Sequence, residues 1–408
     1  MRNAWLHRFA ILTAVATLAL LSLGGLVTSH GVGMAVPDWP NTYGYNMFFF
    51  PVSQWVGGIF YEHTHRLLAS GVGLLTTILA VWLYGKNARS LLRWGGLMFL
   101  GLGIATWIIA PSRWRDAIVS AVVGVAALGV NNFWPQCEPN PKWLRRLGLI
   151  AFFAVVLQGV LGGLRVVLFK DGIGIFHATL AQLFFALICS IALFTSRWWQ
   201  ETASSIDDFA SFRKGKWLVF TATGLILCQL VLGATMRHQH AGLAIPDFPL
   251  AYGRVWPAMD AQSLAHYNQQ RMEITALNPI TRFQIGLQLV HRMFAVLIFG
   301  AVLLSAWLMG KQLGGKHPSA RLGACWLGLL LLQILLGTAT IWSNKAADLA
   351  TAHVVVGAIS LALGSILSIM LFRKLDFVPG LDSSARAANA VVPPVFNATR
   401  PAPSIGIE

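Results

Sequence analysis

Residues 24–44 read GGLVTSHGVGMAVPDWPNTYG, and residues 233–253 read GATMRHQHAGLAIPDFPLAYG. The two stretches start 209 residues apart, and identical residues recur at that fixed offset. The positions with identical partners are Gly24, Gly33, Ala35, Pro37, Asp38, Pro40, Tyr43 and Gly44. Self-similarity at a fixed offset is the signature of an internally repeated architecture. The sequence therefore predicts two similar halves.

Two further blocks recur in the same order in both halves. The first is a His-Arg pair that leads into LAVWLYGK or LSAWLMGK, and the second is LQGVLGG or LQILLGT, about twenty residues ahead of a histidine. The histidines of these blocks are His65 and His177 in the first half and His291 and His353 in the second. Because order and spacing hold across three blocks, the repeat covers most of the chain.

The composition places the chain in a membrane. Of its 408 residues, 56% are hydrophobic and 11% are charged, whereas a soluble domain carries about 25% charged residues. About 18–20 apolar residues span a hydrocarbon core. Ten segments qualify, with at most one arginine in any of them: 9–29, 67–85, 94–112, 117–136, 147–164, 172–196, 217–236, 283–310, 322–344 and 349–372. We therefore expect an all-α, multi-pass protein of the cell inner (plasma) membrane, surrounded by lipid.

The positive charge sets the topology. The net charge of +15 is scattered through short loops, so it does not indicate a nucleic-acid partner. Lys and Arg collect in alternate loops, which the positive-inside rule places in the cytoplasm together with both termini. The loops 30–61, 169–176, 237–282 and 343–348 then face outward, and 113–115 is assigned outward against the rule. None of the four cysteines lies in a long outer loop, so we expect no structural disulfide.

Each half contains four helices in the same order. An even number of helices returns the chain to its starting side, so the halves are expected to be parallel four-helix-bundle repeats, related by a pseudo-two-fold axis along the membrane normal. The predicted organisation is an N-terminal repeat at 1–196 with an inserted helical hairpin at about 94–134, a cytoplasmic linker at 197–216, a C-terminal repeat at 217–374, and a disordered cytoplasmic tail at 375–408.

The four repeated histidines are the strongest chemical signal, because ionisable groups inside a membrane are costly and usually functional. By the predicted topology, all four lie near the outer ends of their helices. Two neutral imidazoles on facing helices of a bundle form an axial pair for haem iron. Arg66 and Arg292 each follow a histidine and are candidate cations for the haem propionates. The alternatives are histidines bonded to backbone carbonyls, and zinc or copper sites.

The halves differ at one acidic residue. Glu62 lies three residues before His65, on the same helix face, whereas Gln288 stands at the corresponding place before His291. This difference predicts a catalytic Glu62 in a first half that binds substrate, and a second half that holds a permanent haem. The alternative is that Glu62 pairs with Arg66 or stabilises the helix N-terminus.

Several other polar residues receive structural assignments. His63 is expected on the solvent side of its helix. The PDWP and PDFP loops are expected to cap the haem crevice, with Asp38 and Asp247 either capping turns or positioning propionates. His238 and His240 are expected at the surface.

The sequence resembles the haem A synthase family. The resemblance rests on GGLVTS at 24–29, the PDWP loop, EHTHR at 62–66, LQGVLGG, HRM at 291–293 and LQILLGT. It implies the oxidation of a ring methyl of haem O to the formyl group of haem A for cytochrome oxidase, with Glu62 as a catalytic residue. The implied iron ligands are His65 and His177 for the substrate haem, and His291 and His353 for a haem B.

The expected partners are haem O, the haem O synthase that supplies it, an unidentified electron donor and a second copy of the chain. Many bacterial relatives carry a cysteine pair in the first outer loop and eight spans, and this chain departs from both patterns. Two other functions stay open from the residues alone. One is a di-haem electron-transfer cytochrome b without chemistry on haem, and the other is a transporter with histidine proton relays.

Overall fold

The computed structural model describes residues 3–134, 137–168, 170–201, 213–271 and 279–373. Over these residues the fold is helical and contains no β-strand. Two isolated bridges, between Thr42 and Tyr45 and between Ala251 and Arg254, close turns in the loops. Ten of the described helices are long and apolar enough to cross a membrane. The predictions of an all-α protein and of ten candidate spans are therefore confirmed.

The long helices match the predicted segments, with earlier starts. They are α1 (Ala4–Ser29), α2 (Gly57–Leu83), α3 (Ala88–Ile109), α4 (Trp114–Phe133), α5 (Lys142–Leu168), α6 (Asp171–Thr195), α8 (Arg213–His238), α10 (Arg282–Leu313), α11 (Pro318–Trp342) and α12 (Ala347–Phe372). The prediction began the second span at 67, because Glu62 and Arg66 carry charge. In the structure the two side chains form a 2.7 Å ion pair on α2, so the helix accommodates both.

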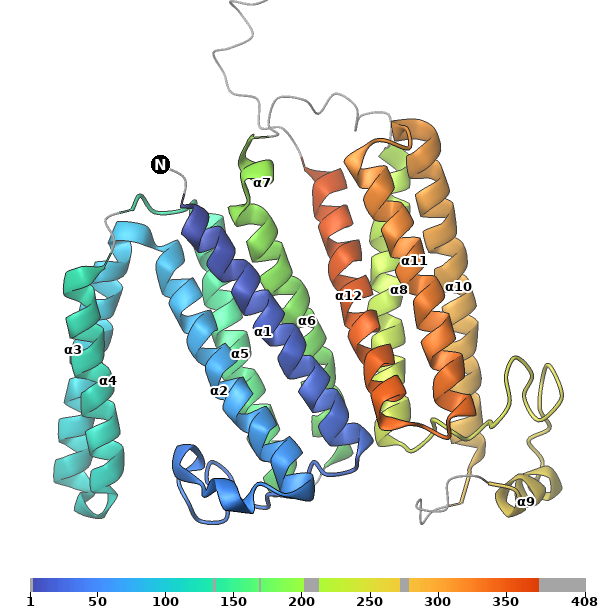
Figure 1. The fold of residues 1–408 in the computed structure, drawn as a ribbon, viewed down its shortest axis with the longest axis horizontal. Coiled ribbons are helices and arrows are strands. Elements are labelled where there is room, and N and C mark those ends of the chain that lie inside the picture. Colours follow the sequence, from blue (N-terminus) through green and yellow to red (C-terminus); the bar gives the residue numbers. More distant parts are fainter. Residues whose placement is uncertain (1–2, 135–136, 169, 202–212, 272–278, 374–408) are drawn as a thin grey trace, which may run out of the picture. The chain divides into compact units, whose positions relative to one another are not determined.

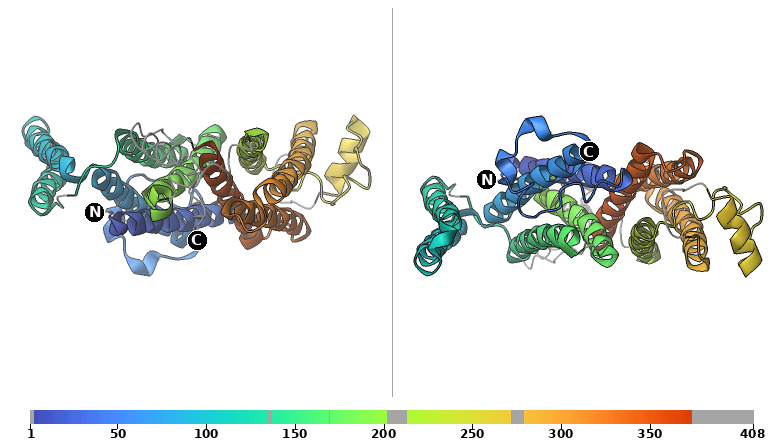
Figure 2. Two further views of the ribbon diagram at one scale, coloured as in Figure 1. Left: turned by 90° about the horizontal axis from the view of Figure 1, so that it is seen from above. Right: turned by 90° about the horizontal axis from the view of Figure 1, so that it is seen from below.

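The long helices other than α3 and α4 form two closed rings of four. Helices α1, α2, α5 and α6 contact one another in the first ring, and α8, α10, α11 and α12 in the second (Figure 2). The rings meet where α12 packs on α1 and α6, and where α6 packs on α8. Consequently α6 and α12 are the most buried spans, with 50% and 56% of their apolar windows inside the protein.

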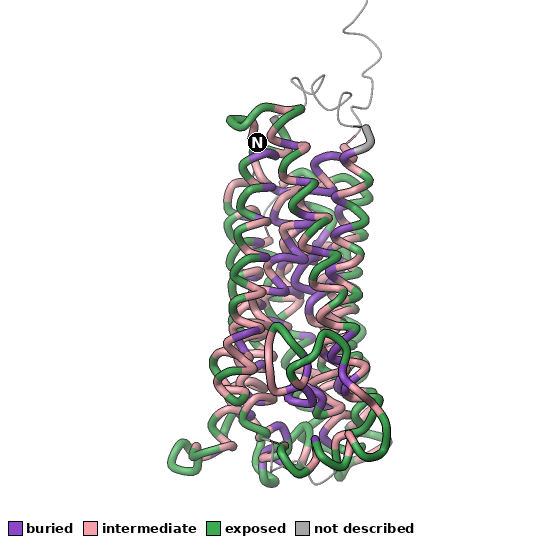
Figure 3. The backbone as a smooth tube through the Cα atoms, turned by 90° about the vertical axis from the view of Figure 1, so that its right-hand side faces the viewer, coloured by how far each residue is buried: buried purple, intermediate pink, exposed green. Residues whose placement is uncertain are grey.

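Residues Met1–Phe372 form one compact unit, in which each ring has its own cluster of buried apolar side chains and α6 contributes to both clusters. The predicted boundaries at 196 and 217 stay a prediction within that unit. Linker residues 202–212 and the predicted tail 375–408 lie outside the described residues. Buried residues are concentrated in the middle of the helical unit, and exposed residues lie along its sides and in its loops (Figure 3). The exposed side chains include large apolar ones such as Phe133 and Ile109. Such a surface suits a hydrocarbon environment.

The predicted hairpin at 94–134 corresponds to α3 and α4, which pack mainly on each other at the edge of the unit (Figure 1). Their close approach depends on glycine. An added Cβ at Gly96 would lie 2.9 Å from the carbonyl oxygen of Gly124, and one at Gly124 would lie 2.7 Å from that of Gly96. The hairpin therefore lies beside the first ring, next to α2, and does not enter it.

The connections lie at two ends of the unit. The start of α1, the end of α12 and the short helix α7 (Arg197–Glu201) lie at one end (Figure 1). The long connections after α1 and α8 lie at the other, and the second of these contains a helix that was not predicted, α9 (Ala261–Gln269). The repeated loops therefore share one end of the molecule.

Candidate functional site

The four repeated histidines lie at similar depths in their helices. Each is within the first ten residues of a long helix, with His65 on α2, His177 on α6, His291 on α10 and His353 on α12. All four helices start at the end of the unit that carries the long connections (Figure 1). One pair of histidines therefore belongs to each ring, near the same end.

Each of these imidazoles packs against a glycine on the neighbouring helix of its ring. An ideal Cβ on that glycine would lie 3.0 Å from Cε1 of His65 or His353, and 3.4 Å from Cε1 of His177 or His291. The glycines are Gly24 beside His65, Gly162 beside His177, Gly233 beside His291 and Gly337 beside His353. At Gly24 and Gly337 a side chain would displace the imidazole, whereas at Gly162 and Gly233 an added Cβ would just reach ordinary contact.

A glutamine stands four residues before three of these glycines, on the same helix face. Gln158 Nε2 donates to the backbone oxygen of His177 at 3.1 Å, and Gln229 Nε2 donates to that of His291 at 2.9 Å. Gln333 contacts the imidazole of His353 with two atoms. Its backbone oxygen lies 3.1 Å from Nδ1 of His353, and its side-chain Nε2 lies 3.3 Å from Nε2 of His353.

These glycines and glutamines share a short sequence pattern beyond the three repeated blocks. The pattern Q-x-x-L-G occurs at 158–162, 229–233 and 333–337, and at 20–24 leucine replaces the glutamine. Each copy supplies the glycine that receives a ring, and the three complete copies also supply an amide that contacts the same histidine. A glycine therefore lies against each of the four imidazoles, and a glutamine ties three of the four histidines to the neighbouring helix.

The donor set suits haem. His177 lies within electrostatic range of His65, and His291 within that of His353. Nδ1 of His353 lies 3.1 Å from the backbone oxygen of Gln333, and the backbone carbonyls of Leu20 and Gln158 face the imidazoles of His65 and His177. When one ring nitrogen is held by the neighbouring helix, the other is left for a ligand. No three His, Cys, Asp or Glu side chains of the described residues gather to hold a metal ion. Each pair therefore fits an iron that brings porphyrin nitrogens as its other ligands.

The two PDWP/PDFP loops are held by their aspartates. Asp38 accepts hydrogen bonds from the backbone N–H groups of Tyr43 and Gly44, both at 2.8 Å, and Asp247 accepts from the equivalent tyrosine and glycine at 2.7 and 2.8 Å. Partial burial alone would raise the pKa of Asp38, but these N–H groups hold it below its usual value. Of the two predicted roles for the aspartates, the contacts fit the capping of turns.

The two predicted arginines fasten the loops to the histidine-bearing helices. Arg66 donates to the backbone oxygens of Val36, Asp38 and Asn41 at 2.7 to 3.0 Å. Arg292 donates to three carbonyl oxygens of the second loop at 2.7 to 3.4 Å. Each arginine thus fixes a loop next to a histidine pair, and its contact with a propionate stays a prediction.

Glu62 and Gln288 hold equivalent loop amides. Glu62 is buried, and its Oε2 accepts from the N–H of Val36 at 2.9 Å while its Oε1 pairs with Arg66 at 2.7 Å. Gln288 Oε1 accepts from the N–H of Ile245 at 2.6 Å. A neutral amide therefore performs the same anchoring in the second ring, and the negative charge of Glu62 goes beyond what the loop contact requires.

The expectation that His63 faces solvent is wrong. Its side chain is fully buried. Its Nδ1 lies 3.2 Å from Oγ1 of Thr42, and its ring packs against Phe50 and Trp55. The helix periodicity correctly turned His63 away from Glu62, but the first loop folds back over that face and excludes water from it.

The expectation for His238 is also wrong, whereas His240 is exposed as predicted. The ring of His238 packs against Gly174 of α6, and its Nδ1 lies 4.0 Å from Oδ1 of Asp171. Helix α8 continues through His238, so it brings this residue into the contact between the rings. Sequence periodicity does not report which helices meet, and so this contact was missed.

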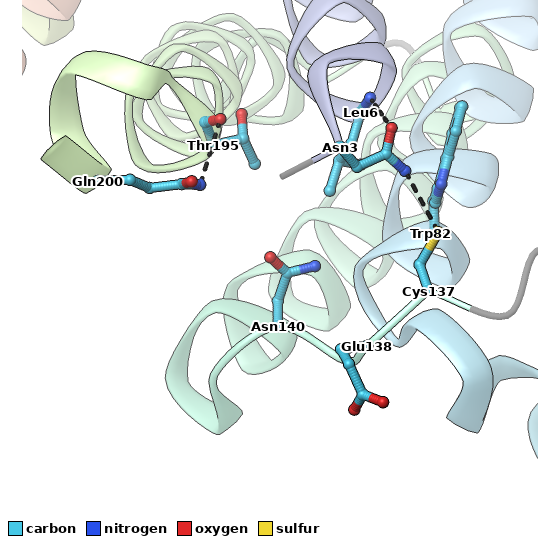
Figure 4. A pocket seen from close by; sticks show the side chains of 8 residues that line it. All are labelled: Asn3, Leu6, Trp82, Cys137, Glu138, Asn140, Thr195 and Gln200. Atoms are coloured by element: carbon cyan, nitrogen blue, oxygen red, sulfur yellow. Dashed lines mark hydrogen bonds between the residues drawn. The ribbon is translucent and has the colours of Figure 1, made fainter. Parts of the chain in front are cut away.

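A small polar pocket of about 120 Å³ lies at the other end of the first ring (Figure 4). Asn3 donates to Sγ of Cys137 at 3.8 Å there, which links the start of α1 to the connection before α5. The lining residues are Asn3, Leu6, Trp82, Cys137, Glu138, Asn140, Thr195 and Gln200. Because none of the four histidines lines this pocket, it is separate from the candidate site.

Comparison with known proteins gives a consistent result. The model of the family described as "Cytochrome oxidase assembly protein" matches residues 7–364. A heme A synthase of Beijerinckia indica subsp. indica is 30% identical over 243 residues, which cover 56% of this chain and 62% of that relative. A heme A synthase of Bacillus cereus strain 03BB102 is 25% identical over 353 residues, which cover 84% of this chain and 86% of the relative.

Proposed function

The chain belongs to the cytochrome oxidase assembly protein family, and from this membership we propose that it is a haem A synthase. It is then a multi-pass membrane oxidoreductase that converts haem O to haem A for cytochrome c oxidase. The observation that carries the site is the set of four histidines, each beside a glycine and grouped into one pair per ring.

His65 and His177 are the proposed axial ligands of the substrate haem, and His291 and His353 those of a resident haem B. Two observations support these assignments: each pair lies within one ring of four helices, and three of the imidazoles face a backbone carbonyl of the neighbouring helix, which leaves their other nitrogen for a ligand. Bound haem would supply the redox chemistry that the oxidation of a methyl group needs. The protein contributes the positions of the four imidazoles, through the four glycines and the glutamine contacts.

Glu62 is the proposed catalytic residue of the first ring. Its carboxylate is held by Arg66 and by the N–H of Val36, so its position next to His65 on α2 is fixed. Gln288 shows that loop anchoring needs no charge. Arg292 binds its own loop through backbone oxygens, and within the described residues it forms no ion pair. A fixed negative charge near the reacting carbon stabilises positive charge that develops there and can accept a proton.

The two rings are proposed to be parallel repeats, related by a pseudo-two-fold axis along the membrane normal. The equivalent loop contacts and the recurring Q-x-x-L-G pattern support this relation. With both termini in the cytoplasm of a plasma-membrane protein, the histidine pairs lie toward the outer face. An outer electron donor, delivery of haem O from its synthase and self-association complete the proposed partners.

Glu62→Gln tests the catalytic assignment. The variant should keep the Val36 contact, because glutamine makes that contact in the second ring, and should retain both haems while haem A production stops. Gln288→Glu is the matched control, since it adds the same carboxylate beside the resident haem and should leave haem A output unchanged. Unaltered haem A production by Glu62→Gln would remove Glu62 from the catalytic machinery.

A di-haem electron-transfer cytochrome b is the second candidate function, and the two histidine pairs favour it equally. It gives no reason for the Glu62–Gln288 difference. The two functions separate on the haem types that the purified protein contains, because an electron-transfer cytochrome would hold haem B in both rings.

A further inference from the structure

The cation Arg165 lies beside the first histidine pair. Arg165 is in the last turn of α5, and its guanidinium group packs against Gly33, where an added Cβ would lie 3.0 Å from Nη2. Arg165 stands three residues after Gly162, on the face of α5 that packs against His177, and its charge interacts with those of His65, His177 and Glu62. Within the described part of the chain, the guanidinium group makes no hydrogen bond or ion pair.

The second ring adds another cation at the same place. Arg237, in the last turn of α8, donates to the backbone oxygen of Gly25 at 2.7 Å and to the hydroxyl group of Ser29. Its guanidinium group lies within electrostatic range of Arg165. Two like charges are thus brought together where the rings meet, and one of them uses its donors on helix α1.

The nearby carboxylates do not neutralise Arg165. Glu62 is bound to Arg66 at 2.7 Å. Asp171 attracts Arg165, but its side chain is 65% exposed and its closest ionic contact is His238, at 4.0 Å. A partly buried cation near a membrane interior is costly unless an anion approaches it. The excess of positive charge therefore indicates that the site receives an anionic ligand.

We propose that Arg165, with Arg237 beside it, is the carboxylate-binding end of the first-ring site and receives a propionate group of the porphyrin substrate. This inference rests on the proposed function and adds to it the residue that orients the substrate. The planar guanidinium group binds carboxylates through two parallel hydrogen bonds. Once a propionate is bound, the two histidine ligands and this anchor together fix the rotation of the porphyrin about the axis through the two histidines.

The second ring contains a related feature at a different sequence position. Gly242 is the repeat partner of Gly33, and an added Cβ there would lie 3.5 Å from Cδ of Lys345. Sequence alignment of the LQGVLGG and LQILLGT blocks instead pairs Arg165 with Thr340. A long cationic side chain therefore packs on the equivalent glycine of each loop, although the repeat does not align the two cations and the contact of Lys345 is made by a methylene group.

The test compares two porphyrins that differ only in their propionates. Ferric haem B and its dimethyl ester are titrated by absorbance into the full-length protein in detergent, with the resident haem retained. The His65→Ala variant defines the part of the binding that belongs to the first ring. A charged hydrogen bond predicts that the wild-type protein binds the free acid about tenfold or more tightly than the ester.

The variants then locate that preference. Arg165→Gln should lose most of the preference for the acid at the first ring, because Arg237 alone remains beside the site, and Arg165→Lys should retain more of it. Arg115→Gln removes the same charge from the remote hairpin and should behave as the wild type. An unchanged preference in Arg165→Gln would overturn the inference and leave the proposed function intact, with a lipid phosphate as the anion at Arg165. The absence of any His65-dependent binding would refute the ligand assignment itself, and this inference with it.

Discussion

Replacing Gly337 with alanine tests whether the glycines position the histidines. The new Cβ would lie 3.0 Å from Cε1 of His353, 0.4 Å inside the 3.4 Å at which ordinary contact begins. The ring must therefore move by about that distance, close to the roughly 0.5 Å within which a working constellation is held. Losses of about 10–100-fold accompany the removal of groups that orient a metal ligand, so we expect haem B affinity to fall about tenfold.

Gly328→Ala is the matched control, because it lies on the same helix and its Cβ would meet nothing within 4 Å. Alanine in place of glycine favours a helix by up to about 1 kcal/mol, so the control should be as stable as the wild type or more so. The assay is the haem B content per chain and the absorbance spectrum after purification, with thermal unfolding measured in parallel. Equal haem retention by both variants would refute the positioning role of Gly337.

Two other predictions concern single contacts. Gln229→Leu should lower the free energy of unfolding by about 1 kcal/mol, the usual contribution of a hydrogen bond. The variant should keep haem B, because Leu20 occupies the equivalent position beside His65 in the first ring, and loss of haem B would contradict the equivalence. Because the folded-state pKa of Asp38 is below its ordinary value of 3.8, its stabilising contribution is complete above that value and is lost as the pH falls through the lower one. Protection of the Tyr43 amide from hydrogen exchange, corrected for its intrinsic pH dependence, should therefore persist down to about pH 4, whereas Asp38→Asn should lack it at neutral pH.

The sequence predicted the helices because spanning segments need long runs without charge. It misplaces the start of α2 for the same reason, because charged residues normally end a spanning segment, whereas Glu62 and Arg66 neutralise each other one turn apart on the helix. The histidines were found because the repeat places them at matching positions. Their neighbours were not assigned, because the repeat blocks were used only to align the halves.

Contacts between elements were harder to predict. Helices that are apolar on most sides present no single stripe that identifies the packing partner. The approach of His238 to Gly174 and of Arg237 to α1 therefore follows from the packing of the rings and was not predicted. The burial of His63 depends on the path of the first loop, which periodicity does not report. The Q-x-x-L-G spacing, in contrast, was present in the sequence and identifies the glycines directly.

The most direct test of the central claim is acid–acetone extraction of haem from the purified protein, with identification by chromatography and mass. The wild-type protein should contain haem B together with haem O or haem A. His353→Ala should lose haem B, and His65→Ala should lose haem O and haem A while keeping haem B. Haem B alone, at two per chain, would contradict the synthase assignment and favour the electron-transfer cytochrome, and a complete absence of haem would contradict both.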